Sequence, residues 1–314
     1  MTDQTTRHRE RWATVLDQLR ELLRSAGKAG VVVDGADAPR RALFTDQLVG
    51  AGFVVTDGPQ CRVGAPPRDL VVWLRAGGSP HGHEAGADVV IDLRDPAWPV
   101  IRRVRDGLAA EDSWYVTESR AFFAIRAVTW DTQFGDDLPA YARGVSAANL
   151  PRGGVVLDAG CGTGRALGAL RDAVGEEGVV LALDVTPEML AVAAGRAREA
   201  RASLLLSDAR RLPIADASVD GVFAAGLVNH MPDPVAGLAE LARVTRPGGR
   251  LALFHPSGRA ALAARHRRVL REDDLFAQAP LRAATGRAGW RLDTYDDHDE
   301  RFLALATRVP AGSP

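Results

Sequence analysis

The stretch VVLDAGCGTG, residues 155–164, decides the fold of this chain. Its three leading apolar residues are typical of a short strand that is buried on both faces. The aspartate and the three alternating glycines that follow predict a sharp turn into a helix. Because glycine has no Cβ, a ligand can lie directly against such a turn, and the start of the helix supplies free N–H groups.

The sequence of this stretch argues against two other kinds of glycine-rich turn. A phosphate-binding P-loop requires Gly-x-x-x-x-Gly-Lys-Ser/Thr, and this stretch contains neither Lys-Ser nor Lys-Thr. The dinucleotide fingerprint Gly-x-Gly-x-x-Gly requires a third glycine where Arg165 stands. The pattern Asp-x-Gly-x-Gly-x-Gly instead resembles the first motif of the class I S-adenosylmethionine-dependent methyltransferases. The alternative is an ordinary glycine-rich strand–helix turn, which the following segments make less favourable.

Two further apolar runs, residues 181–184 and 204–209, predict strands that end in a carboxylate. Asp184 follows the glycine turn by about 20 residues, the spacing at which an acidic side chain meets ribose hydroxyls in a doubly wound fold. An ionised carboxylate only accepts hydrogen bonds, so it can take both hydroxyls. The resemblance implies that Asp208 accepts from the adenine amino group and that the Ala209 N–H donates to the ring. A solvated strand-end Asp208 is the alternative.

The residues after Asp184 begin a helix, with Thr186 as the expected N-cap and Pro187 in the first turn. In the family, a side chain at the position of Met189 packs on the adenosine, although a core methionine fits the sequence equally well. The implied cofactor is S-adenosylmethionine. The motifs and the resemblance together assign its contacts to Asp158, Gly160, Cys161, Gly162, Thr163, Gly164, Asp184, Val185, Met189, Asp208, Ala209 and Gly226.

Alternating strand and helix patterns continue toward the end of the chain. Residues 212–225 resemble the family's fourth strand segment, an amphipathic helix follows, and residues 251–254 predict a fifth strand. A closing strand pair is expected over 290–295 and 301–307. This order predicts an α/β fold, a Rossmann-like doubly wound sheet with ligands beyond the carboxyl ends of its strands. The resemblance spans residues 115–309 and points to the small-molecule branch that includes ubiquinone-type and antibiotic-tailoring methyltransferases.

Histidines follow two of the predicted strands. His230 comes after the fourth and His255 after the fifth, so both are expected to face the transferred methyl group. Histidine titrates near neutral pH, which suits a general base, but a structural hydrogen bond is the alternative for each, and proximity alone can supply much of the rate. In similar methyltransferases an aromatic-bearing helix closes over the cofactor. The candidates for lid and substrate contacts are Trp130, Phe134 and Tyr141, with plain packing as the alternative, and Asn229.

The first third of the chain carries a second strand-to-glycine run, VVVDG, at residues 31–35. It resembles the start of a uridine-kinase-like P-loop domain. Arg40 stands at the second P-loop glycine, Arg41 at the lysine, and Ala42 at the hydroxyl residue that binds Mg²⁺. We therefore expect a smaller, degenerate kinase-like α/β domain that performs no ATP chemistry. An unrelated α/β accessory domain is the alternative.

The length of 314 residues favours two domains, which we place at residues 1–110 and 111–314. A formal net charge of -1 gives no electrostatic reason to expect nucleic acid. No run of 18 apolar residues and no signal-peptide core occur, so we expect no membrane partner. The 2 cysteines, Cys61 and Cys161, lie in different predicted domains, which fits a reducing cytoplasm. No cysteine or histidine spacing indicates a metal site.

The sequence therefore predicts a methyltransferase that acts on a small molecule, for which bacterial secondary metabolism is one setting. One alternative is a regulatory subunit that binds the cofactor without catalysis, and the intact motifs argue against it. Another is a nucleotide-binding enzyme that uses the first domain, and the residues at 40–42 argue against it. The apolar elements of the first domain must be covered, and a homodimer is one way to cover them.

Overall fold

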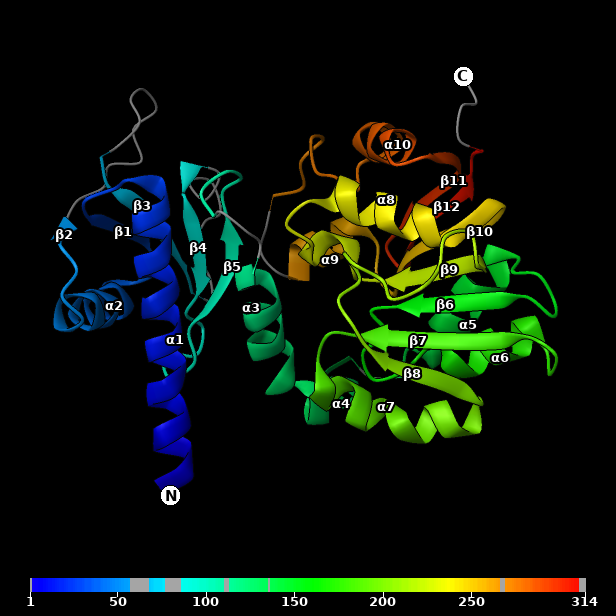
Figure 1. Cartoon of the computed structure of the whole chain (residues 1–314), viewed down its shortest axis with the longest axis horizontal. Helices are drawn as coiled ribbons and strands as arrows, with labels where there is room; N and C mark the ends of the chain where they lie inside the picture. The colour runs from blue at the N-terminus through cyan, green and yellow to red at the C-terminus, as the bar shows by residue number, and fades with distance from the viewer. Residues whose placement is uncertain are drawn as a thin grey trace. The chain divides into compact units, whose positions relative to one another are not determined.

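The computed structural model describes residues 2–56, 68–76, 86–109, 113–134, 136–265 and 269–310. Its contacts divide the chain into two compact units, Met1–Ala121 and Phe122–Pro314 (Figure 1). This division falls later than the boundary that we predicted between residues 110 and 111. The reason is the helix α3 (Ser113–Ala124), because Trp114 and Tyr115 of this helix belong to the core of the first unit.

The first unit is a five-stranded sheet in the order β2-β1-β3-β4-β5. Neighbouring strands are parallel except β5, which runs antiparallel to β4. Two helices cover one face, because their apolar side chains, among them Leu19 of α1 and Phe44 of α2, share a core with Val31 and Leu70. The elements are α1 (Thr2–Ala26), β1 (Val31–Gly35), α2 (Ala38–Gly50), β2 (Val55–Thr56), β3 (Leu70–Arg75), β4 (Val89–Asp92) and β5 (Val100–Val104).

The second unit is a seven-stranded sheet in the order β11-β12-β10-β9-β6-β7-β8. The strands from β8 to β10 are parallel, and β12 is antiparallel to both of its neighbours. The strands are β6 (Val155–Ala159), β7 (Val179–Asp184), β8 (Ala202–Leu206), β9 (Val219–Ala225), β10 (Thr245–His255), β11 (Trp290–His298) and β12 (Arg301–Arg308). The doubly wound methyltransferase-like sheet that the sequence predicts is therefore present.

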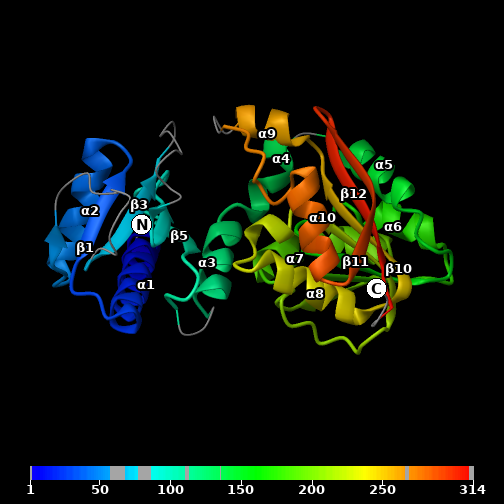
Figure 2. The ribbon, with the colours of Figure 1, turned by 90° about the horizontal axis from the view of Figure 1, so that it is seen from above.

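Helices cover both faces of this sheet. Seen from above, α8 and α10 lie on one side and α5 and α6 on the other (Figure 2). Each face of the sheet has its own hydrophobic core, and successive strand residues alternate between the two, as the period of a strand requires. Leu157 belongs to the core that includes α8, and Val156 belongs to the core that includes α6. The helical segments are η2 (Ala127–Thr129), α4 (Trp130–Phe134), α5 (Leu138–Ala148), α6 (Leu167–Val174), α7 (Pro187–Glu199), η3 (Val228–His230), α8 (Pro234–Val244), α9 (Arg259–Arg265) and α10 (Gln278–Arg287).

The strand order changes direction at β6, whose neighbours are β7 and β9. In open parallel sheets this switch point is where the loops at the carboxyl ends separate and leave room for a ligand. The glycine turn after β6 lies at this point. In the part of the chain that the structure describes, no helix has both the length and the apolar character to cross a membrane.

Candidate active site

The glycine turn after β6 has the backbone conformation that its glycines predict. Gly160, Gly162 and Gly164 have φ angles of 69°, 53° and 82°, which residues with a Cβ rarely adopt. A Cβ added at Gly160 would meet Leu227 Cδ1 at 2.9 Å, whereas one at Gly162 has no described atom within 4 Å. The backbone at Gly162 is therefore open to a ligand. The Cys161 N–H donates to Leu183 O at 2.8 Å and holds the turn beside β7.

The carboxylate of Asp184 joins this turn to the end of β7. Its Oδ2 accepts from the Gly162 N–H at 3.0 Å and its Oδ1 accepts from the Thr186 N–H at 2.8 Å. Burial raises the pKa of Asp184, and these backbone donors act in the opposite direction. A carboxylate has about four acceptor positions, so two remain for a pair of ligand hydroxyls.

Asp158, at the end of β6, is a buried acid with an unsatisfied oxygen. Its side chain is 1% exposed, and its Oδ2 has no hydrogen-bond partner among the described residues. Burial, together with the nearby charge of Asp184, raises the pKa of Asp158 to about 8. A buried polar atom without a partner is costly, and a ligand that brings a cationic donor would satisfy it.

The remaining residues predicted to touch the cofactor differ in how much of them a ligand could reach. The Cys161 thiol is buried, which raises its pKa well above the ordinary value, and its Sγ lies 3.8 Å from Gly162 O within the turn. Met189 in the first turn of α7 and Ala209 after β8 are also buried, whereas Val185 is partly exposed. Gly226 follows β9 with a φ of 65°, and its N–H donates to Phe254 O at 3.0 Å.

Asp208 is already engaged by an arginine that our sequence analysis did not single out. Arg210 donates to it through its backbone N–H at 3.0 Å, through Nε at 3.0 and 3.1 Å, and through Nη2 at 2.8 Å. Both side chains are less than a fifth exposed. The Asp-x-Arg spacing is a local signal for this pair, because residues two apart in a turn can close on each other.

Two predicted acceptor-side residues come together through a third. The ring of Phe123 meets His230 edge-to-face, with centroids 5.4 Å apart, and meets Trp130 at 5.6 Å. Phe123 was not among the predicted site residues, although it precedes the aromatic segment that was. Asn229, beside His230, is exposed. This aromatic trio of Phe123, Trp130 and His230 forms a wall built from α3, α4 and η3.

Other predicted residues make contacts with the sheet and its loops. Tyr141 packs on Phe254 and Phe223 of the sheet, with centroid distances of 5.0 and 6.4 Å, and burial raises its pKa, which fits its packing alternative. The His255 ring is held at the end of β10, where its Nδ1 lies 3.1 Å from Ser257 N and 3.0 Å from Ser257 O. The side chain of Phe134 and the whole of Cys61 lie outside the described residues.

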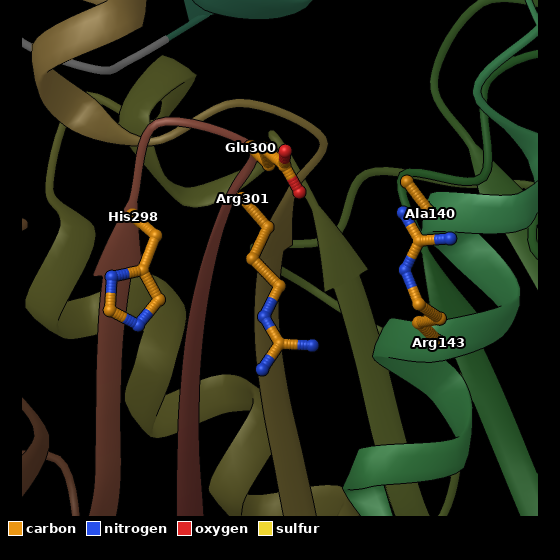
Figure 3. A pocket seen from close by; sticks show the side chains of 5 residues that line it. All are labelled: Ala140, Arg143, His298, Glu300 and Arg301. Carbon is orange, nitrogen blue, oxygen red and sulfur yellow. The ribbon is translucent and has the colours of Figure 1, made fainter.

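A cavity of about 180 Å³ lies between α5 and the turn that joins β11 to β12. His298, Glu300 and Arg301 line it from the turn, and Ala140 and Arg143 from the helix (Figure 3). Arg301 is paired with Asp296, which accepts from its Nε at 2.8 Å. Because no predicted site residue lines this cavity, we assign it no ligand.

In the described part of the chain, no three histidine, cysteine or acidic side chains gather around a common point. The features described at the site are the glycine turn, the buried carboxylate of Asp158, the partly exposed Asp184 and the aromatic wall.

Comparison with known proteins places this unit among methyltransferases. A family model described as a methyltransferase domain matches residues 157–253. The O-methyltransferase rstn1 of Aspergillus nomiae is 30% identical over 155 residues, which cover 46% of this chain and 68% of that protein. The demethylmenaquinone methyltransferase of Bacillus licheniformis is 36% identical over 110 residues, covering 35% of this chain and 47% of that protein. The chain spans about a third to a half of the length of the first curated relatives it matches.

A solved structure agrees on the fold. It is the complex between the Haloferax volcanii Trm112 methyltransferase activator and a protein described as a methyltransferase. The match has a TM-score of 0.51 at 21% identity and covers 60% of this chain and 98% of the matched one.

Proposed function

The chain belongs to the class I S-adenosylmethionine-dependent methyltransferases, and from this premise we propose that it transfers the methyl group of S-adenosylmethionine to a small molecule. The observation that carries the proposal is the meeting of the open turn at Gly162 with the carboxylate of Asp184. The pair consists of a backbone segment that no described side chain covers and a carboxylate that can accept hydrogen bonds from hydroxyl groups. One hydrogen bond joins the two. A nucleoside with a ribose needs both.

The residues present fit the ribose and the ammonium group of the cofactor. Asp184 would hold the ribose hydroxyls, whereas adenine recognition by Asp208 and the Ala209 N–H would require Arg210 to give up part of its hold on the Asp208 carboxylate. The unsatisfied Oδ2 of Asp158 would accept from the ammonium of the methionine part, since it is buried and has no described partner. These assignments use acceptors where the cofactor has donors, and a buried acid where it has a cation.

The cofactor supplies an electrophilic methyl group on a sulfonium. The protein must orient an acceptor in line with that methyl group and exclude water. The aromatic wall suits this task, since Trp130 and Phe123 present apolar surface next to the imidazole of His230. His230 would anchor the acceptor or take its proton when an O–H or N–H is methylated. His255 is the weaker candidate, because the backbone of Ser257 already engages its Nδ1.

Calorimetric titration with S-adenosylmethionine tests the proposal most directly. We expect the wild-type chain to bind. Asp184→Ala should bind about tenfold more weakly or worse, because a charge-assisted acceptor pair contributes roughly 1.5–3 kcal/mol. Asp172→Ala, which removes an exposed carboxylate on α6, is the matched control and should bind normally. Wild-type affinity in Asp184→Ala would show that the ribose lies elsewhere, and binding without methyl transfer to any small-molecule acceptor would favour the regulatory alternative.

For the first unit we propose a degenerate phosphate loop without phosphoryl transfer. The Arg41 guanidinium donates to the carbonyls of Gly35 and Ala36 at 2.8 and 2.7 Å, so it is tied to the loop instead of reaching outward. Asp37 caps α2 by accepting from the Arg40 N–H at 3.0 Å and places a carboxylate where a phosphate would need donors. These contacts support a unit without phosphoryl transfer, and we propose separately that its role is to form an interface with a second copy of the chain.

A further inference from the structure

Asp131, on α4, is the centre of an ion-pair network that reaches the glycine turn. Its Oδ1 accepts from the Thr163 hydroxyl at 2.6 Å and from Arg165 Nε at 3.1 Å. Its Oδ2 accepts from Arg196 Nη1 on α7 at 2.6 Å. One carboxylate therefore ties together α4, the turn after β6 and α7.

The surrounding groups close this network into a ring. Arg196 Nη1 also donates to Thr163 O at 2.9 Å, so both the side chain and the backbone of Thr163 are held. Arg165 donates from Nη2 to the carbonyl of Asp131 at 3.1 Å and pairs through Nη1 with Asp137. The Arg165 side chain is only 6% exposed, and the charge it carries is thus compensated inside the protein.

Asp131 is ionised in this setting. Partial burial acts to raise its pKa, but the hydrogen bonds from Thr163 and Arg196 and the charges of both arginines outweigh it and lower the pKa. Hydrogen bonds to a charged group are the strong ones, and networks of them stiffen the segments that they join.

We propose that Asp131 is a positioning residue that fixes the position of the glycine turn at 160–164 relative to the aromatic wall. The argument rests on the proposed function, because it treats the turn at 160–164 as the cofactor site. Thr163 was expected to contact the cofactor, but this residue is 2% exposed and its hydroxyl donates a hydrogen bond to Asp131. Its contribution is therefore to the shape of the turn.

The effect of Asp131 extends to the aromatic wall because its neighbour in the chain, Trp130, is part of that wall. Trp130 precedes Asp131 on the same helical turn, its ring packs on Phe123, and Phe123 packs on His230. Loss of the Asp131 carboxylate would free α4 from the glycine turn and loosen this aromatic wall at the same time. Through its contacts within the protein, Asp131 thus sets the geometry of both sides of the site.

The test compares Asp131→Asn, which keeps the shape and removes the charge, with a pair of changes at its partner. Thr163→Val removes the hydroxyl, and Thr163→Ser keeps it. The matched control is Asp293→Asn, because Asp293 likewise accepts from a threonine hydroxyl, that of Thr307, and pairs with Arg291 and Arg250. Its side chain is 23% exposed, against 31% for Asp131, and it lies on β11, away from the turn.

Calorimetry with S-adenosylhomocysteine gives the first readout. We expect about tenfold weaker binding in Asp131→Asn and in Thr163→Val, and near-normal binding in Thr163→Ser and in the control. The double variant that combines Asp131→Asn with Thr163→Val should lose no more than either single variant. Normal binding in Asp131→Asn, or failure of Thr163→Ser to restore it, would overturn the inference while the proposed function stands. A wild-type chain that binds no S-adenosylhomocysteine would overturn both.

Amide hydrogen exchange of the ligand-free protein gives a second readout that needs no cofactor. In Asp131→Asn, residues 130–134 and 160–164 should exchange faster together, by about tenfold, while the core strands keep their protection. Unchanged exchange in both segments would contradict the positioning role, and the control variant should leave both segments as in the wild type.

Discussion

The buried acid Asp158 couples the stability of this protein to pH. Its pKa is raised from the ordinary 3.8 to about 8, first by burial and then by the charge of Asp184. Between these values the unfolded chain has released a proton that the folded protein still holds. The contribution of protonated Asp158 to the free energy of unfolding is therefore complete below about pH 4 and is lost as the pH rises to about 8.

Asp158→Asn tests this coupling, because asparagine keeps the shape and does not titrate. The unfolding free energy of the ligand-free wild type should fall relative to the variant by at most about 1.4 kcal/mol per pH unit between pH 4 and 8. Above that window the difference should stay level. Urea unfolding at pH 5, 7 and 9 measures it, and a difference that does not change with pH would show that Asp158 is ionised throughout.

At the scale of secondary-structure elements, the acceptor side depends on three short segments, α3, α4 and η3. None of them is long enough to be stable alone, and their aromatic side chains hold them together. The wall that they form places His230 beside the proposed acceptor position. A change at His230 should therefore lower turnover more than it lowers cofactor affinity.

For His230→Ala we expect turnover with the native acceptor to fall by about 10²–10⁴-fold if the imidazole takes a proton, with little change in the cofactor dissociation constant. His298→Ala is the matched control, because His298 is a 78% exposed histidine at the end of β11. Steady-state kinetics and calorimetry on the same samples separate the two effects. Unchanged turnover in His230→Ala would reduce His230 to a structural residue.

At the scale of the whole molecule, the first unit is expected to be catalytically silent but needed. A chain that begins near residue 111 keeps the cofactor motifs, yet it loses the partners of Trp114 and Tyr115 in the core of the first unit. We expect it to be less soluble than the full chain or to change its oligomeric state. Light scattering of both decides this, and equal solubility and equal mass would contradict the interface role. ATP hydrolysis by the full chain would contradict the proposal of a degenerate phosphate loop.

The parts of the site that follow from local rules were predictable from the sequence. Glycine at alternating positions permits positive φ values, and the apolar runs mark strands that end at one edge of a sheet. The fold and the nearness of Asp184 to the turn follow from these two rules together. The domain boundary did not, because α3 contributes Trp114 and Glu118 to the first unit through contacts with distant residues such as Arg11.

The sequence by itself determined the fold of the second unit and the motifs at the ends of its strands, because these depend on residues close together in the chain. Only the tertiary structure decided which side chains meet. Asp131 reaches Thr163 and Arg196, and Phe123 reaches His230, across long separations that leave no periodic signal. The raised pKa of Asp158 arises in the same way, since burial and a neighbouring charge exist only once the strands have packed.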